Sequence, residues 1–487
     1  MEVVRLHTEE LQRIRENDPC KTDFDVDGDE DWMQNMSDED LEQLGKDIAN
    51  NTHLTDVYLY RDALDDHRMS CLFRGLKRSS SITKMGLYEN QFSAAGVRSM
   101  VPFLQNANNL TKLDLDDNNL QSEGFNMLFR ALGDSTINAL HCERCDIESI
   151  EIDTKLIPRQ LKELHLDGNI INADGCRGLA KLLQGGDATA LTDLYLSNNQ
   201  VDYDGVEILA KALRKNKSLT TLHLCKNEIG DDGVAALAAA LKSNATLLYL
   251  SLDNNKIGDD GIETLVNALH RNTTLREFYL RYNTGVSKRG KISLLKLAID
   301  ISSIEATLQS NHTLREIKFA NSKVYDTIQR LIDRAVAINI TSYSPEDAGR
   351  EKVRQIQIHG TKRAQLADLQ GVTNSVYSEI DSLYLPEVLA LINRHHGGKE
   401  LFSALKSTMT GLLSRIDMKL CIQEEVARRE AAITRHKEEA AYHVARIDEH
   451  GVKMEELKAR LAAMEDPDQK MNQETMTKSN KRRRVDG

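Results

Sequence analysis

Two cysteines have a spacing that could support redox or metal chemistry. Cys142 and Cys145 form a C-x-x-C pair, the spacing of thiol redox motifs and of one half of many zinc sites. The sequence contains no second C-x-x-C and no suitably spaced pair of histidines that would complete a tetrahedral set of ligands. We therefore expect neither a metal ion nor a cofactor.

Acidic residues near the N-terminus resemble the start of a calcium-binding loop. Residues 23–34 read DFDVDGDEDWMQ, with Asp at the first, third and fifth positions and Gly at the sixth, as in an EF-hand loop. The pattern then fails, because Glu30 stands where an apolar residue is expected and Gln34 stands where a bidentate Glu is needed. We interpret residues 20–31 as a solvated acidic linker, and Ser37 as the N-cap of a helix that precedes the first repeat.

Motifs of the common enzyme classes are absent from the sequence. There is no G-x-x-x-x-G-K-[ST], no G-x-S-x-G and no H-E-x-x-H, the signatures of phosphate-binding loops, serine hydrolases and zinc proteases. We therefore predict a non-enzymatic protein without catalytic residues.

Composition narrows the class of protein further. The 487 residues include 63 Lys plus Arg against 75 Asp plus Glu, a net charge of −12, so we do not expect general binding to nucleic acid or to anionic membranes. No apolar run approaches the ~18 residues that a membrane-spanning helix needs, and the N-terminal residues lack the apolar stretch of a secretory signal. Seven thinly spread cysteines fit a reducing compartment. We predict an intracellular protein, cytoplasmic or nuclear or both.

The elements that must position any functional residue are repeats. The stretches LTKLDLDDNNL, LTDLYLSNNQV, LTTLHLCKNEI and LLYLSLDNNKI begin at Leu110, Leu191, Leu219 and Leu247. All fit L-x-x-L-x-L-x-x-N-x-φ, where φ is apolar, and ten such frames occur from Leu54 to Leu314, most of them 28 residues apart. The alternating leucines predict a strand, and apolar residues at steps of three and four predict a helix after it. We interpret the glycine fourteen residues after the frame start as allowing a tight turn into the helix; it occurs as Gly96, Gly124, Gly175, Gly205, Gly233 and Gly261.

These repeats resemble those of the leucine-rich repeat family, in particular its ribonuclease-inhibitor-like class. The resemblance implies an α/β solenoid, with a curved parallel sheet on the concave face and helices on the convex face. It also implies a structural role for Cys142 and Cys145, since cysteine is a common substitute at the leucine and asparagine positions that they occupy. Two departures stand out: little helical pattern follows the fourth frame, and the ninth unit gains about eleven residues around Lys288–Ile304, which predicts an extended helix or a loop plus a helix.

The domain organisation follows from where the repeat pattern begins and ends. We predict an acidic N-terminal segment (1–36), a leucine-rich repeat solenoid of about ten repeats (37–325), a helical region (326–411) with breaks near 342–345, 384–386 and 395–398, a long helix (412–466) and a disordered basic tail (467–487). In 412–464 an apolar residue recurs every seven positions, so this helix packs against a partner or the solenoid, or forms a self-associating coiled coil. The tail contains Lys481, Arg482, Arg483 and Arg484, which fit a nuclear-import signal or a generic basic tail.

Candidate binding residues are those that alternate with the strand leucines and therefore face away from the core. Tyrosines gather at both ends of this strip, with acids and histidines between them. Tyrosine is enriched in protein interfaces, although aromatic residues also suit any strand. The candidate protein-binding residues are Tyr58, Tyr60, Tyr88, Asp116, His141, Glu143, His165, Asp167, Tyr195, His223, Asp253, Tyr279 and Arg281.

Three functions are compatible with this pattern. The first is an interaction scaffold that binds a protein partner on the concave face. The second is a regulator of a GTPase, because Ran GTPase-activating proteins share this class of repeat; their pattern includes a strongly acidic segment after the repeats, which this chain lacks. The third is an inhibitor of a basic enzyme, which the acids in the middle of the strip would attract.

Overall fold

The computed structural model describes residues 2–27, 33, 35–133, 135–185, 190–300, 302, 304–319, 327–342 and 344–358. The chain divides into two units, 1–376 and 377–487, and every described residue belongs to the first. The predictions for 359–411, the long helix of 412–466 and the basic tail with Lys481, Arg482, Arg483 and Arg484 lie outside the described residues and remain predictions.

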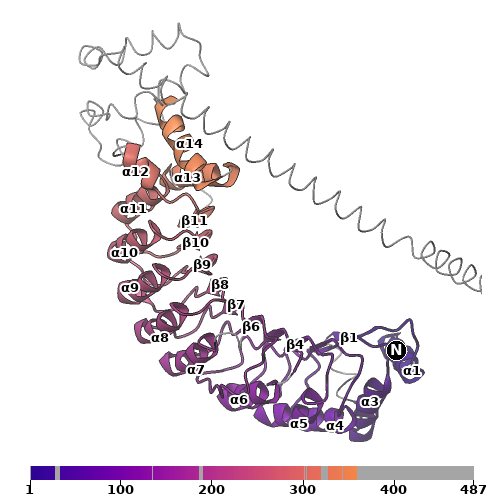
Figure 1. The fold of residues 1–487 in the computed structure, drawn as a ribbon. Helices are drawn as coiled ribbons and strands as arrows, with labels where there is room; N and C mark the ends of the chain where they lie inside the picture. Colours follow the sequence, from indigo (N-terminus) through magenta and orange to yellow (C-terminus); the bar gives the residue numbers. More distant parts are fainter. Residues whose placement is uncertain are drawn as a thin grey trace, which may run out of the picture. The chain divides into compact units, whose positions relative to one another are not determined.

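The described residues build one parallel sheet in which each strand pairs with the strands before and after it in the sequence (Figure 1). Its leucines, such as Leu194 and Leu222, are fully buried or nearly so, because each short strand turns one face toward the helices. The eleven strands are β1 (Asp23–Asp27), β2 (Asp56–Tyr60), β3 (Lys84–Gly86), β4 (Lys112–Asp114), β5 (Ala139–His141), β6 (Glu163–His165), β7 (Asp193–Tyr195), β8 (Thr221–His223), β9 (Tyr249–Ser251), β10 (Glu277–Tyr279) and β11 (Glu316–Lys318).

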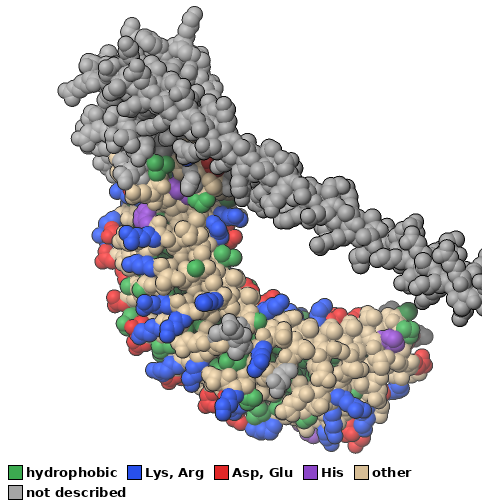
Figure 2. Space-filling model, in the orientation of Figure 1, with side chains coloured by type: hydrophobic (Ala, Val, Ile, Leu, Met, Phe, Trp, Pro, Cys, Tyr) green, Lys and Arg blue, Asp and Glu red, His purple; other side chains and the backbone are tan. Residues whose placement is uncertain are grey.

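Helices form the second layer, on the convex side of the solenoid (Figure 1). Neighbouring helices pack side by side, as α7 does on α8 and α8 on α9. Lys and Arg side chains gather, with acids among them, along this helical edge (Figure 2). The helices are α1 (Glu2–Arg15), α3 (Asp38–Asn50), α4 (Asp66–Gly75), α5 (Ala94–Leu104), α6 (Gln121–Ala131), α7 (Ala173–Leu183), α8 (Tyr203–Leu213), α9 (Gly230–Leu241), α10 (Asp259–Leu269), α11 (Lys288–Ala298), α12 (Ile304–Gln309), α13 (Thr327–Thr341) and α14 (Pro345–Ile358).

The N-terminal end of the sheet differs from the sequence-based expectation. The interpretation of residues 20–31 as a solvated linker is wrong for β1, which pairs in parallel with β2. Its acids alternate with Phe24 and Val26, which are fully buried, so the two apolar side chains add to the core while the aspartates point to the other face. The helix predicted after Ser37 is confirmed: the Ser37 side chain accepts the Asp40 backbone N–H, and Asp40 completes a capping box.

A row of buried asparagines joins consecutive repeats where the strands end. Asn199, for example, accepts the Ile171 backbone N–H at 2.9 Å and donates to the Leu166 carbonyl at 2.9 Å. Cys145 takes the asparagine position in its repeat and donates from Sγ to the carbonyls of Leu115 and Glu143. Cys142 and Cys145 are both free and fully buried, and burial raises the pKa of the Cys145 thiol to about 12. The C-x-x-C pair is therefore part of the core.

The repeated glycines have a different role from the one that we predicted. Gly96, Gly124, Gly175, Gly205, Gly233 and Gly261 lie inside helices, and none of them has a positive φ. They provide space: a Cβ on Gly233 would lie 2.8 Å from Val206 Cγ1 in the previous repeat. Left-handed backbone occurs instead just before the asparagine that recurs in the repeat frame, as at Asn198 (φ 54°) and Lys226 (φ 52°).

Both predicted departures from the repeat are present. Residues 142–162, between β5 and β6, contain no helix. The longer ninth unit forms two helices, α11 and α12. Helices α13 and α14 then pack against α11 and α12. The fully buried Lys352 ammonium joins these parts by donating to the carbonyls of Ala298 and Asn311 at 2.7 and 3.0 Å.

Candidate functional site

Six aromatic rings form a continuous row on the face of the sheet that is turned away from the helices. We call this row the ring ladder. Successive ring centroids lie 3.9, 4.0, 4.5, 4.6 and 5.1 Å apart, and the first four pairs are stacked nearly parallel. The members, one from each strand β5 to β10, are His141, His165, Tyr195, His223, Tyr249 and Tyr279.

The regular register of the repeats explains the ladder. His165 pairs with Tyr195 in the sheet, and Tyr195 pairs with His223, so their side chains emerge at the spacing of neighbouring strands, about 4.8 Å. At β9 the equivalent residue is Ser251, which is too small to stack and is buried. Tyr249, two residues earlier on the same face, fills the row. Our sequence analysis missed Tyr249, although the two-residue alternation of a strand was a signal that could have found it.

The other predicted tyrosines form a separate group near the N-terminal end. Tyr60 and Tyr88 stack with their centroids 4.4 Å apart, and the Arg61 guanidinium lies 6.0 Å from the centre of the Tyr60 ring. Tyr58 lies against Gly86, where a Cβ would come within 2.5 Å of the Tyr58 ring. Gly86 and Asp114 hold the equivalent positions on β3 and β4, so this group is not continuous with the ring ladder.

The predicted aspartates are tied to the backbone of the next repeat. Asp116 accepts the Glu143 N–H at 2.6 Å, Asp253 accepts the Arg281 N–H at 2.7 Å, and Asp167 accepts the Ser197 N–H. Burial raises the pKa of Asp116 to about 7, helped by the neighbouring Asp114 carboxylate, and raises that of Asp167 to about 6. These carboxylates join repeats, and they present less negative charge to a partner than the sequence suggested.

Burial keeps two of the ladder histidines, His141 and His223, uncharged. Burial lowers the pKa of His141 to about 3, and it also lowers that of His223, so both are neutral at pH 7. The Glu143 carboxylate lies 3.4 Å from His165 Nδ1, and this contact lowers the pKa of Glu143. At the far end Arg281 pairs with Asp253 at 2.8 Å and lies 5.4 Å from the centre of the Tyr279 ring.

Two groups of described residues on this face bring three metal-binding side chains within 4.8 Å of one another. They are His141, Glu163 and His165, and Asp114, Asp116 and His141. Neither group fits a metal ion well. The parallel imidazoles of His141 and His165 direct their nitrogen lone pairs side by side, whereas ligands must converge on the ion. In the second group an Asp116 oxygen already accepts a backbone N–H.

The charge state of Asp116 leads to a pH-dependent prediction. The folded protein holds this proton up to about pH 7, whereas the unfolded chain releases it near pH 3.9, so ionisation of Asp116 reduces stability progressively between these values. Asp116→Asn keeps an oxygen that can accept the Glu143 N–H and removes the charge. The three-unit difference corresponds to about 4 kcal/mol, which partial solvent exposure reduces to about 2 kcal/mol.

We therefore expect Asp116→Asn to stabilise the protein by about 2 kcal/mol at pH 8 and by little at pH 4. Urea unfolding of both proteins at the two pH values measures the difference. An equal difference at both pH values would contradict this assignment of the proton.

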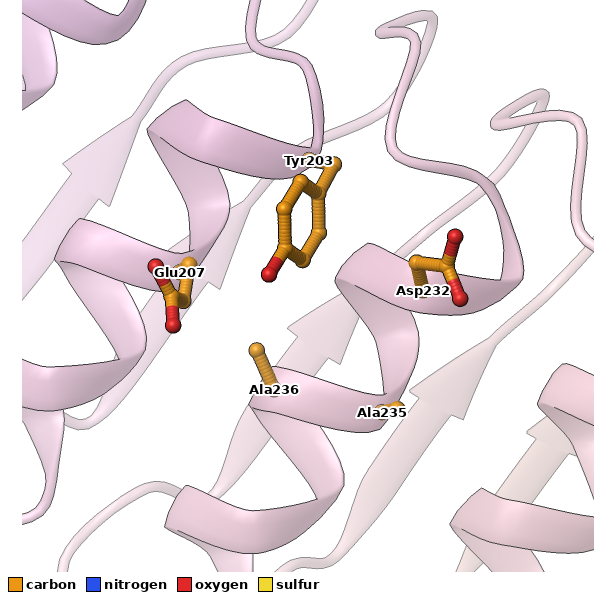
Figure 3. Close-up of a pocket in the computed structure, with 5 residues that line it drawn as sticks. All are labelled: Tyr203, Glu207, Asp232, Ala235 and Ala236. Carbon is orange, nitrogen blue, oxygen red and sulfur yellow. The ribbon is translucent and has the colours of Figure 1, made fainter.

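A hollow on the helical side of the solenoid has no set of side chains comparable with the ring ladder. It lies between α8 and α9 and is lined by Tyr203, Glu207, Asp232, Ala235 and Ala236, with the Tyr203 ring between the two helices (Figure 3). The small alanines leave the hollow open, and Tyr203 is 44% exposed. Its lining contains two carboxylates, but no histidine, cysteine or cation that would complete a reactive set.

Comparisons with known proteins identify the class of this protein. A model described as the TMOD/LMOD leucine-rich domain matches residues 186–286, and a leucine-rich repeat model matches residues 106–128. No curated protein matches the sequence. Among solved structures, "Leiomodin-1 Actin-Binding Site 2 (ABS2)" is similar at 20% identity and a TM-score of 0.24, over 36% of this chain and 89% of that one. The repeats, the parallel sheet and the family matches together define a leucine-rich repeat protein.

None of the described helices is long and apolar enough to cross a membrane.

Proposed function

We propose that this protein is a non-enzymatic interaction scaffold that binds a partner protein on the concave face, with the ring ladder at the centre of the contact. The observation that supports this most directly is the row of six rings across six consecutive strands. Each ring is held by its neighbours, so little side-chain entropy is lost when a partner binds. Tyrosine hydroxyls and imidazole nitrogens add polar contacts along an otherwise flat aromatic surface.

The geometry favours this function over inhibition of a basic enzyme. That alternative relied on the acids in the middle of the strip, and Asp116, Asp167 and Asp253 are each engaged with the following repeat. A contact dominated by charge would weaken steeply with salt, whereas a contact centred on stacked aromatic rings would depend less on salt. Regulation of a GTPase stays an alternative, and a turnover assay with and without this protein tests it.

Actin is the first partner to test, because the similar leiomodin-1 structure is titled as an actin-binding site and residues 186–286 match the model of the TMOD/LMOD leucine-rich domain. The probes are monomeric actin and filaments, followed by affinity purification from the source cells if neither binds. The chain itself offers a matched pair of variants, since Tyr195 lies in the ring ladder and Tyr203 lies on the opposite, helical side.

We expect Tyr195→Ala to weaken partner binding by about 30-fold, the effect of a ~2 kcal/mol hot spot, while Tyr203→Ala leaves the affinity unchanged. Binding titrations at low and high salt measure both the loss and its ionic component. If the two variants bind alike, the ring ladder is not the binding surface.

A further inference from the structure

A third group of possible metal ligands lies on α3 and α4, outside the strand face that carries the ring ladder. Asp38 is the first residue of α3, and His67 and Cys71 lie on α4. His67 Nε2 is 3.0 Å from both Asp38 carboxylate oxygens and 3.8 Å from Cys71 Sγ. One ligand atom from each residue lies within 4.8 Å of the other two.

These separations match those around a tetrahedral ion. Zinc bonds of about 2.0–2.1 Å to nitrogen and oxygen and 2.3 Å to sulfur place neighbouring ligand atoms about 3.3–3.6 Å apart. The observed values of 3.0 and 3.8 Å lie on either side of that range. Because the side chains of His67 and Asp38 are 67% and 51% exposed, they can make the shift of a few tenths of an ångström that an ion requires.

The fold holds the three side chains together at fixed positions. His67 and Cys71 are four residues apart on one helix, so they share a face. Helices α3 and α4 approach each other closely through Gly45 and Gly75; a Cβ on Gly75 would lie 2.7 Å from the Lys46 backbone nitrogen. Ser37 and Asp65 cap the two helices. The caps fix where each helix starts, and so place Asp38 and His67 in the first turns of α3 and α4.

We propose that Asp38, His67 and Cys71 form a binding site for a divalent transition metal ion of the zinc class, with a fourth position left for water or for a group from another molecule. Carboxylate, imidazole and thiolate together are a ligand set suited to such ions. The carboxylate and the thiolate balance the two positive charges of the ion. On binding, the Cys71 thiol proton leaves to solvent and the proton at His67 Nε2 moves to Nδ1, so one proton is released per ion.

Arg74 contacts the sulfur of Cys71 without being one of the three proposed metal ligands. Its Nη2 donates to Cys71 Sγ at 2.9 Å, and its own charge is offset by Glu42, whose carboxylate oxygen lies 3.7 Å from Arg74 Nε. Such a hydrogen bond orients a metal ligand and stabilises its charged form. Arg74 is therefore a positioning residue for Cys71.

The simpler explanation is a surface hydrogen bond between His67 Nε2 and the Asp38 carboxylate, beside a buried thiol. An exposed pair of this kind contributes little to stability, and it does not require the thiol. The two explanations differ in one observable: only a metal site brings the Cys71 sulfur into contact with an added ion.

The test is a titration of the full chain with Co²⁺, whose thiolate complexes have a charge-transfer absorption in the near ultraviolet, followed by competition with Zn²⁺. The variants are His67→Ala, which changes an exposed side chain, and Cys71→Ser. Cys20→Ser is the matched control, since Cys20 is a free, exposed cysteine that is not one of the three grouped side chains. Circular dichroism confirms that each variant folds, and the number of bound ions is measured for each.

We expect the intact chain and Cys20→Ser to show the thiolate-to-cobalt absorption, to lose it on adding Zn²⁺, and to bind one more ion than either site variant. The loss of affinity in His67→Ala should exceed the roughly 10–100-fold that follows removal of an outer-shell partner. Absence of the absorption in the intact chain, or its survival in folded His67→Ala, would overturn the proposal. Neither result bears on the ring ladder, which this site does not touch.

Discussion

Replacing Asn227 by Ala is expected to lower the free energy of unfolding by about 4 kcal/mol. The Asn227 side chain accepts the Val201 N–H at 3.0 Å and donates to the carbonyls of Leu196, Leu224 and Cys225 at 2.8, 3.2 and 3.2 Å. Asn227 is 4% exposed, so water cannot replace these bonds. Each buried backbone group left unpaired costs about 1–3 kcal/mol, and the two strongest bonds alone account for most of the expected loss.

The control for this prediction is present in the chain itself. Cys145 occupies the asparagine position of its own repeat and donates to two carbonyls, so Asn227→Cys should retain more stability than Asn227→Ala. Urea unfolding followed by circular dichroism measures both. Because each repeat contacts mainly its neighbours, the Ala variant should also unfold less cooperatively, starting near β8. A loss under 1 kcal/mol in Asn227→Ala would show that the asparagine row does not hold the repeats together.

Gly45→Ala is expected to destabilise the protein by about 3 kcal/mol. A Cβ at this position would lie 2.8 Å from the Leu76 backbone nitrogen and 3.1 Å from Gly75 Cα. Backbone atoms cannot move aside as a side chain can, so α3 and α4 must separate. Overpacking of this kind costs about 1–3 kcal/mol and occasionally more, which exceeds the gain of up to about 1 kcal/mol from replacing a helical glycine with alanine.

Gly205→Ala provides the matched substitution. This glycine is also buried in a helix, but the nearest atom to its new Cβ is the Cys176 sulfur at 3.1 Å, the next being Val201 Cγ1 at 3.3 Å. We expect Gly205→Ala to change stability by less than about 1 kcal/mol, because the small clash and the helix gain oppose each other. Thermal unfolding measures the stability loss of each variant. A larger loss in Gly45→Ala than in Gly205→Ala would show that the close approach of α3 and α4, and not alanine in a helix as such, causes the destabilisation. Equal losses would contradict our view that α3 and α4 require the missing Cβ.

The strand face carrying the ring ladder was predictable, and the reason is periodicity. A repeat of fixed length places equivalent residues at equivalent positions, so the buried leucines, the asparagine row and the residues of the strip could be assigned to turns and faces without coordinates. For the same reason Tyr195 and His223 hold equivalent positions in consecutive repeats and pair in the sheet. Periodicity does not predict how side chains of different length pack together. At β9, for example, Ser251 holds the equivalent position, but the ring that stacks in the ladder is that of Tyr249.

The remaining features depend on contacts that no single repeat contains. The strand at Asp23–Asp27 reads as a charged linker, and only pairing with β2 buries Phe24 and Val26. From the sequence, Asp116, Asp167 and Asp253 were expected to be charges on the surface. In the structure each accepts a backbone N–H from the next repeat. Asp38 lies 29 residues before His67, and the close approach of two helices through their glycines brings it there. The sequence by itself thus determined the repeating unit, because local spacing dictates local structure. Tertiary structure decided which side chains meet, because that depends on the distance between neighbouring units.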